Sequence, residues 1–370
     1  MTAKRRTTAW ALSWLCVLVI VYASLYPFEN WRNQDLAPWF FVGAPWSAYN
    51  TWFDIFSNLL GYLPIGFWWC LAAMRSQWPR SRSFWFAGLS ACMLSFGMEC
   101  VQSYLPTRVP SQLDWLLNTL GALLGAGLAL VLEKRGWLYH WSQFRQQWLT
   151  TDASGSLVLL VLWPLALLYP VTMPFGLGHV SARLGKKLQD AFPMYADKIV
   201  EFSEVLTLAT TPALEMLCVT LGVLVPCLLA LSVCRRFSQR LIGVWLVLLL
   251  AVLANGLSAT LTYGPEHAWH WLLPQVWGGM GCGALLCLAV IKWRENSVLM
   301  VLSGAQLLLL LLLNLLPAST YFEQTMQTWE QGRFIRFHGL TPWLSWWWPW
   351  LLLAWASWRM MRRSAVSHQA

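Results

Sequence analysis

The chain has 370 residues, of which 58% are hydrophobic and only 11% are charged. Soluble globular domains carry about 25% charged residues, so this composition excludes an ordinary soluble fold. The formal net charge is +9, but the placement of the basic residues explains this excess better than a nucleic-acid partner does.

Apolar segments of roughly 17–25 residues, the length that an α-helix needs to cross a bilayer, recur along the whole chain. The sequence therefore predicts an all-α polytopic membrane protein with about ten transmembrane helices. The predicted spans are 10–26, 53–73, 84–104, 113–132, 156–174, 213–234, 241–261, 271–291, 298–317 and 343–358. Most Lys and Arg residues lie in alternate connecting segments, and the positive-inside rule then places both termini in the cytoplasm.

The first predicted span follows Lys4, Arg5 and Arg6, as the apolar part of a signal peptide would. Its apolar run continues into YPFENW without a small-x-small cleavage site, which favours an uncleaved first helix. The nine cysteines lie mostly inside predicted spans, and no pair has the spacing of zinc ligands. We interpret them as small apolar core residues, and the sequence predicts no metal site and no cofactor.

A polar stretch between Glu133 and Thr151 divides the chain. We predict a four-helix domain at 1–135, a cytoplasmic connector at 136–155 and a six-helix region at 156–370. DWLLNTLGALLGAGLALVL from Asp114 is echoed by HWLLPQVWGGMGCGALLCL from His270, and DIFSNLLG by EMLCVTLG. The rear region is either a degenerate copy of the front domain with two helices added, or apolar helices that are similar by chance.

The predicted outer loop 176–212 contains SARLGKKLQDAFPMYADKIVEF. Its mixed charges and spaced apolar residues suggest an amphipathic helix on the outer surface. An ordinary solvated loop is the alternative.

Two apolar segments share a polar pattern, DIFSNLLG from Asp54 and DWLLNTLG from Asp114, with Asn four residues after Asp and Gly three residues further on. On the predicted topology these and other polar residues lie at one depth, in the outer third of the membrane. The candidate ligand-binding residues are Asp54, Asn58, Glu99, Gln102, Arg108, Ser111, Asp114 and Asn118.

Helical spacing places these residues on faces of their helices. Positions 54, 58, 61 and 65 form one stripe, positions 111, 114, 118, 121 and 125 form another, and Glu99 shares a face with Gln102. Acids that face lipid are costly and small residues let helices approach closely, so we expect both stripes to face the bundle interior. Arg108 could pair with Glu99 or Asp114 in a closed structural network. Three acids against one Arg would still leave surplus carboxylate, which favours a pocket for a ligand.

The segments SLYPFENW, DIFSNLLGYLPIGF and ECVQSYLPTRVPSQLDWLLNTLGALLGA resemble the VanZ-like family of membrane proteins, over roughly residues 15–133. The family is named for a member associated with low-level resistance to the glycopeptide teicoplanin. The resemblance implies a multi-pass protein of the bacterial inner membrane with a role in the cell envelope. The rear half departs from the family pattern.

Three functions remain open at this stage. The favoured one is binding or transport of an envelope lipid, such as a polyprenyl-phosphate or a glycolipid, at an outer-leaflet polar pocket. An enzyme acting on such a lipid would use Glu99 and Asp114 as acid and base, but Ser111 has no His nearby in sequence to activate it. A non-catalytic scaffold is the third. His267 and His270 beside Glu266 are better explained as interfacial polar residues than as metal ligands, and no nucleic-acid module is present.

Overall fold

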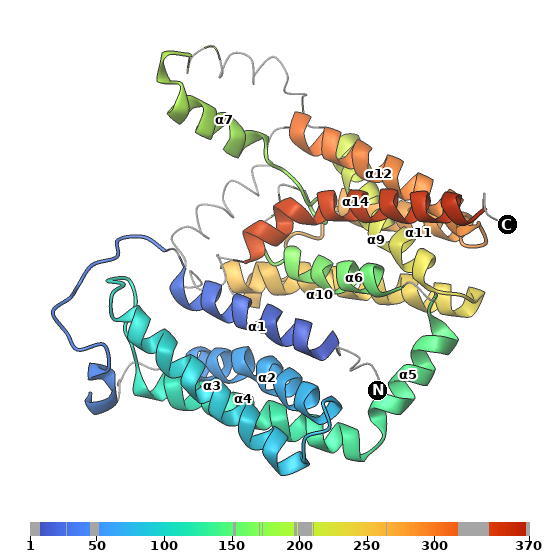
Figure 1. Ribbon diagram of the computed structural model, residues 1–370. Helices are drawn as coiled ribbons and strands as arrows, with labels where there is room; N and C mark the ends of the chain where they lie inside the picture. Colours follow the sequence, from blue (N-terminus) through green and yellow to red (C-terminus); the bar gives the residue numbers. More distant parts are fainter. Residues whose placement is uncertain are drawn as a thin grey trace. The chain divides into compact units, whose positions relative to one another are not determined.

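The computed structural model (Figure 1) describes residues 8–26, 28–44, 52–150, 153–169, 171, 173–195, 198, 209, 211–263, 265–316 and 340–367. Over these ranges the chain is helical and has no β-strand, apart from one isolated bridge between Leu149 and Cys234. It folds as two compact units, Met1–Gln143 and Phe144–Ala370. The predicted all-α class is confirmed.

Unit 1 contains four long helices, with a short 3₁₀ turn, η1 (Phe40–Gly43), in the connection after the first. They are α1 (Thr8–Leu25), α2 (Trp52–Arg75), α3 (Arg80–Gln102) and α4 (Gln112–Lys134). Helix α5 (Trp137–Trp148) follows, so the stretch predicted as a connector begins with a helix. Ser111 ends the preceding loop and caps α4, because its Oγ accepts hydrogen bonds from the backbone N–H groups of Leu113 and Asp114.

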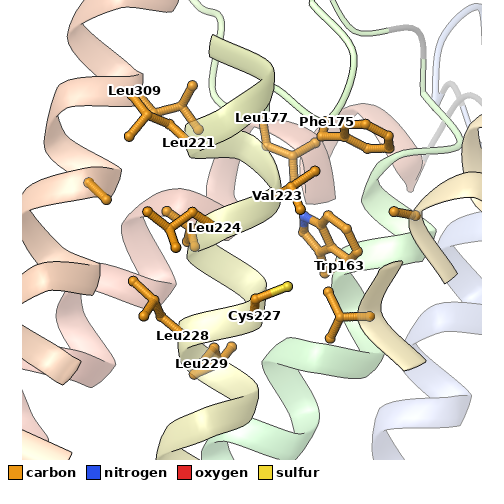
Figure 2. Close-up of a cluster of buried hydrophobic side chains, with 14 of the residues drawn as sticks. Trp163, Phe175, Leu177, Leu221, Val223, Leu224, Cys227, Leu228, Leu229 and Leu309 are labelled. Carbon is orange, nitrogen blue, oxygen red and sulfur yellow. The ribbon is translucent and has the colours of Figure 1, made fainter. Parts of the chain in front are cut away.

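Unit 2 is built around α9 (Pro212–Val233), whose residues from Cys218 onward are all buried. A helix that is apolar all round is expected at the centre of a bundle. Figure 2 shows Trp163, Phe175 and Leu309 approaching α9 from different segments. The other elements of the unit are α6 (Ser154–Ala166), α7 (Ser181–Ala191), η2 (Pro193–Tyr195), α10 (Phe237–Tyr263), η3 (Pro265–His267), α11 (Pro274–Ala289), α12 (Glu295–Leu315) and α14 (Thr341–Ser367).

Six helices in the described part of the chain are long and apolar enough to cross a membrane. They are Asp54–Arg75, Arg80–Gln102, Gln112–Lys134, Pro212–Val233, Phe237–Thr260 and Glu295–Leu315. Large apolar side chains stay exposed along them, as Leu246, Leu249, Leu253 and Leu257 do on α10. A contiguous apolar surface of this size suits lipid rather than water. The chain is therefore a multi-pass membrane protein.

The fifth predicted span, 156–174, is too long. Helix α6 ends at Ala166, because Pro170 and Pro174 follow closely and proline disfavours a helical residue before it and lacks the N–H that continues a helix. Phe175 and Leu177 then fold back into the core of unit 2. Part of the predicted amphipathic segment forms α7, and most of residues 196–210 lie outside the described residues.

All nine cysteines are free. Five of them, Cys70, Cys218, Cys227, Cys234 and Cys287, are buried. This agrees with their interpretation as core residues.

Candidate polar site of unit 1

Helices α2 and α4 approach so closely that glycine is required between them. A Cβ atom added at Gly121 would collide with the carbonyl oxygen of Leu59, and one at Gly125 with that of Leu63. On α2 the contact is made by Gly66, which lies against the backbone of Ala122. The α4 stripe therefore faces the bundle interior, as the sequence predicted, and there it packs against α2.

The α2 stripe is only partly as predicted. Ile65 is buried and Asp54 and Asn58 are half-buried, but Gly61 is exposed and has no atom near the place of a Cβ. The prediction that Gly61 faces the bundle interior is wrong. Because α2 meets α4 along Leu59, Leu63 and Gly66, Gly61 falls on the other side of the helix.

Two hydrogen bonds join the polar ends of α2, α3 and α4. The Asn58 Nδ2 atom donates a hydrogen bond to Asp114 Oδ1 at 2.7 Å, which links α2 to α4. The backbone N–H of Ser111 donates to Glu99 Oε2 at 2.9 Å, which links α4 to α3. Following the topology predicted from the sequence, we call Asn58, Glu99, Ser111 and Asp114 the outer polar cluster.

Glu99 is the most buried acid of this cluster, with 4% of its surface exposed. Both Asp114 and Arg108 lie close enough to act electrostatically on its carboxyl group, with opposite signs. A carboxyl group in such a position has a high free-energy cost unless neighbouring groups or a ligand compensate for its lost hydration. This makes Glu99 the residue most in need of a functional explanation.

Arg108 and Gln102 bind the end of α1. Arg108 donates to the backbone carbonyls of Ala23 and Tyr26, at 3.1 and 2.9 Å. Gln102 Nε2 donates to the carbonyl of Ser24 at 2.9 Å. A cation at a helix C-terminus satisfies its last carbonyl groups and its dipole, so these two residues fix α1 against the α3–α4 turn.

Asn118 lies one turn deeper than the outer polar cluster and is buried. Its Nδ2 atom donates to Ser95 Oγ at 3.0 Å. Tyr62, also buried, lies beside Ser95 and near Glu99. Sequence reasoning missed Tyr62 and Ser95, although Tyr62 lies four residues after Asn58 and Ser95 four residues before Glu99, which is one helical turn in each case.

A hollow of about 430 Å³ opens at the same end of unit 1. Its lining residues are Asn30, Trp31, Arg32, Pro106 and Thr107. The loop that follows α1 is held to the α3–α4 turn by the bonds from Arg32 N to Tyr104 O and from Gln34 Nε2 to Ser103 O. Phe28 and Asn30 in this loop have positive φ angles of 65° and 60°, which non-glycine residues adopt at a cost.

The histidines of unit 2 lie outside this site. His267 contacts His270 with ring centroids 4.7 Å apart, and its Nδ1 atom is 3.6 Å from Glu266. Among the residues that the structure describes, no group of three or more His, Cys, Asp or Glu side chains is placed to hold a metal ion.

The front part of the chain matches a known protein family. Residues 7–133 match the model of the VanZ/LLP1 family, and this range contains every residue of the outer polar cluster. No curated protein and no solved structure matches the chain. The front part of this multi-pass membrane protein is therefore similar to the VanZ/LLP1 family.

Proposed function

We propose that the protein acts in the bacterial inner membrane and binds or moves an envelope lipid or glycolipid at the outer polar cluster. The observation that carries this proposal is the buried Glu99, held beside Asp114 at the meeting point of three candidate spans. Ionisable residues inside membrane helices are costly, and they commonly mark ligand sites or proton pathways.

The proposed membrane topology follows the distribution of Lys and Arg residues. In it the protein crosses the membrane ten times, both termini are in the cytoplasm, and the outer polar cluster is on the outer side. Residues 1–135 carry the site, 136–155 connect, and 156–370 form a second helical region that descends from the same ancestral unit. The helix packing supports this last point, since Gly279 and Gly283 of α11 lie against the backbone of α9, as Gly121 and Gly125 of α4 lie against the backbone of α2.

A lipid head group would have room at this end of unit 1. The hollow lined by the loop after α1 and by the α3–α4 turn carries Arg32, whose guanidinium group suits a phosphate or carboxylate. A role in teicoplanin-type resistance or in envelope biogenesis, which the family resemblance suggests, would follow from binding such a lipid.

Identification of the lipids that co-purify with the protein tests the proposal. The wild type and the Glu99→Gln/Asp114→Asn variant are purified gently and their bound lipids are identified by mass spectrometry. The matched control, Glu29→Gln/Asp35→Asn, makes the same chemical changes at exposed loop positions of unit 1.

We expect one specific polyprenyl-phosphate or glycolipid on the wild type and on the control, and its loss from the Glu99/Asp114 variant. The same bulk phospholipids on all three proteins would contradict a ligand pocket and favour a scaffold. Conversion of the bound lipid on incubation would instead indicate an enzyme.

A further inference from the structure

A second polar layer lies one helical turn below the outer polar cluster. Tyr62, Ser95 and Asn118, which we call the inner polar group, come from α2, α3 and α4 respectively. Each is four residues deeper than Asn58, Glu99 or Asp114, so each lies below its partner on the same helix face. All three are buried, Tyr62 with 5% and Asn118 with 6% of its surface exposed.

The inner polar group is only partly satisfied. Asn118 uses its amide N–H to bind Ser95 Oγ. The Tyr62 hydroxyl lies beside Ser95 but outside hydrogen-bonding geometry, and neither it nor Asn118 Oδ1 has a hydrogen-bond partner among the described residues. The ring of Tyr62 is fixed by apolar neighbours, including Ile20, Ala91 and Ala122.

Buried polar atoms without a partner are rare because their lost hydration is not replaced. Here two such atoms, the Tyr62 hydroxyl and Asn118 Oδ1, belong to residues that both lie beside Ser95. With the Asn118 amide oriented so that Nδ2 binds Ser95, the missing partner must donate a proton to Asn118 Oδ1, and it can accept the proton of Tyr62. A hydroxyl group does both with one oxygen atom, whereas a phosphate or carboxylate oxygen would repel Asn118 Oδ1.

We propose that Tyr62 and Asn118 bind a hydroxyl group of the lipid head group, so that the lipid of the outer polar cluster has a sugar or glycerol head group. The inference rests on the proposed function and narrows its ligand class from anionic or neutral lipids to hydroxyl-bearing ones. Glu99 and Asp114 directly above fit the same ligand, because carboxylates accept hydrogen bonds from neighbouring hydroxyl groups.

The test uses the full chain in phosphatidylcholine nanodiscs and native mass spectrometry. The probes are decyl β-D-glucoside, 1-O-decylglycerol and decyl β-D-glucoside with every hydroxyl methylated. The proteins are the wild type, Tyr62→Phe, and the matched control Tyr104→Phe, which removes the same hydroxyl from an exposed position of unit 1.

We expect at least one hydroxyl-bearing probe to bind the wild type and Tyr104→Phe equally, and Tyr62→Phe at least tenfold more weakly. Binding of the glucoside alone would identify a sugar head group, and binding of the glycerol ether alone a glycerol head group. The methylated glucoside should not bind.

Three results would overturn the inference. They are equal binding to Tyr62→Phe and wild type, equal binding of the methylated and parent glucosides, or no binding of either hydroxyl probe. A change in melting temperature without a change in binding for Tyr62→Phe would likewise overturn it, because the inner polar group would then have a structural role alone. The failure of this inference can be told apart from the failure of the proposed function. If only this inference fails, Tyr62→Phe retains the lipid that Glu99→Gln/Asp114→Asn loses.

Discussion

Asn58 donates its side-chain N–H to the Asp114 carboxylate at 2.7 Å, across the closest helix pair of unit 1. A neutral hydrogen-bond donor on α2 therefore faces a carboxylate on α4, where the backbones of the two helices are in close contact. The two Asp-x3-Asn patterns are thus not equivalent in the fold, since the Asn of the first binds the Asp of the second.

Replacing Asn58 with Asp should turn this attraction into repulsion between two carboxylates. We expect a loss of about 1–3 kcal/mol in stability near neutral pH, with partial recovery at acidic pH as one of the carboxyl groups takes up a proton. Thermal unfolding of the purified variant at several pH values measures this. Asn33→Asp, the same change at an exposed loop position, should have no comparable effect.

Gly121→Ala should destabilise unit 1, because the added methyl group meets the backbone carbonyl of Leu59 rather than a movable side chain. Overpacking of this kind costs about 1–3 kcal/mol. Gly61→Ala is the matched control, since that position is open and Ala favours helix by about 1 kcal/mol over Gly. Equal melting temperatures for the two variants would disprove the close α2–α4 contact.

In unit 2, Arg359 and Glu295 form an ion pair at 2.6 Å, with only 4% and 11% of their side chains exposed. Removing one partner leaves the other charge buried, so Glu295→Gln should cost about 3–5 kcal/mol. The pair Arg80–Glu133 is largely exposed, and Glu133→Gln should cost at most about 1 kcal/mol. Thermal unfolding of both variants in the same detergent compares the two pairs, and a larger loss for Glu133→Gln would contradict this ranking.

His179 lies in the extended segment before α7, outside the candidate spans, and its Nδ1 atom is 2.7 Å from the carbonyl of Leu313. Burial lowers the pKa of His179, and the hydrogen bond to Leu313 only partly opposes this. The unfolded chain, where His has a pKa of about 6.5, then takes up a proton more readily than the folded chain. Stability is therefore present above this pH and is lost as the pH falls through the lowered pKa.

Melting temperatures between pH 8 and pH 5 test the role of His179. The wild type should lose more stability on acidification than His179→Gln does. Parallel curves for the two proteins would assign the acid sensitivity to other groups.

Particular residues show which features of the fold and the site could be predicted from the sequence. Hydropathy indicated the helices, and three- and four-residue spacing placed Asn118, Gly121 and Gly125 correctly on the buried face of α4. Spacing alone could not exclude Gly61, because the face that α2 presents depends on the position of α4. Tyr62 was missed for a similar reason, since a lone tyrosine in an apolar helix has no signal until the fold brings it beside Ser95.

The glycine contacts between α2 and α4 also limit how the site can open. Backbone lies directly against backbone at Gly66, Gly121 and Gly125, so there are no side chains in between that could change rotamer to let these helices slide apart. We therefore expect the two helices to move together. Under the proposed function, access to Glu99 would involve a movement of α1 or α3. The hydrogen bonds from Arg108 and Gln102 to the end of α1 would have to break for α1 to move.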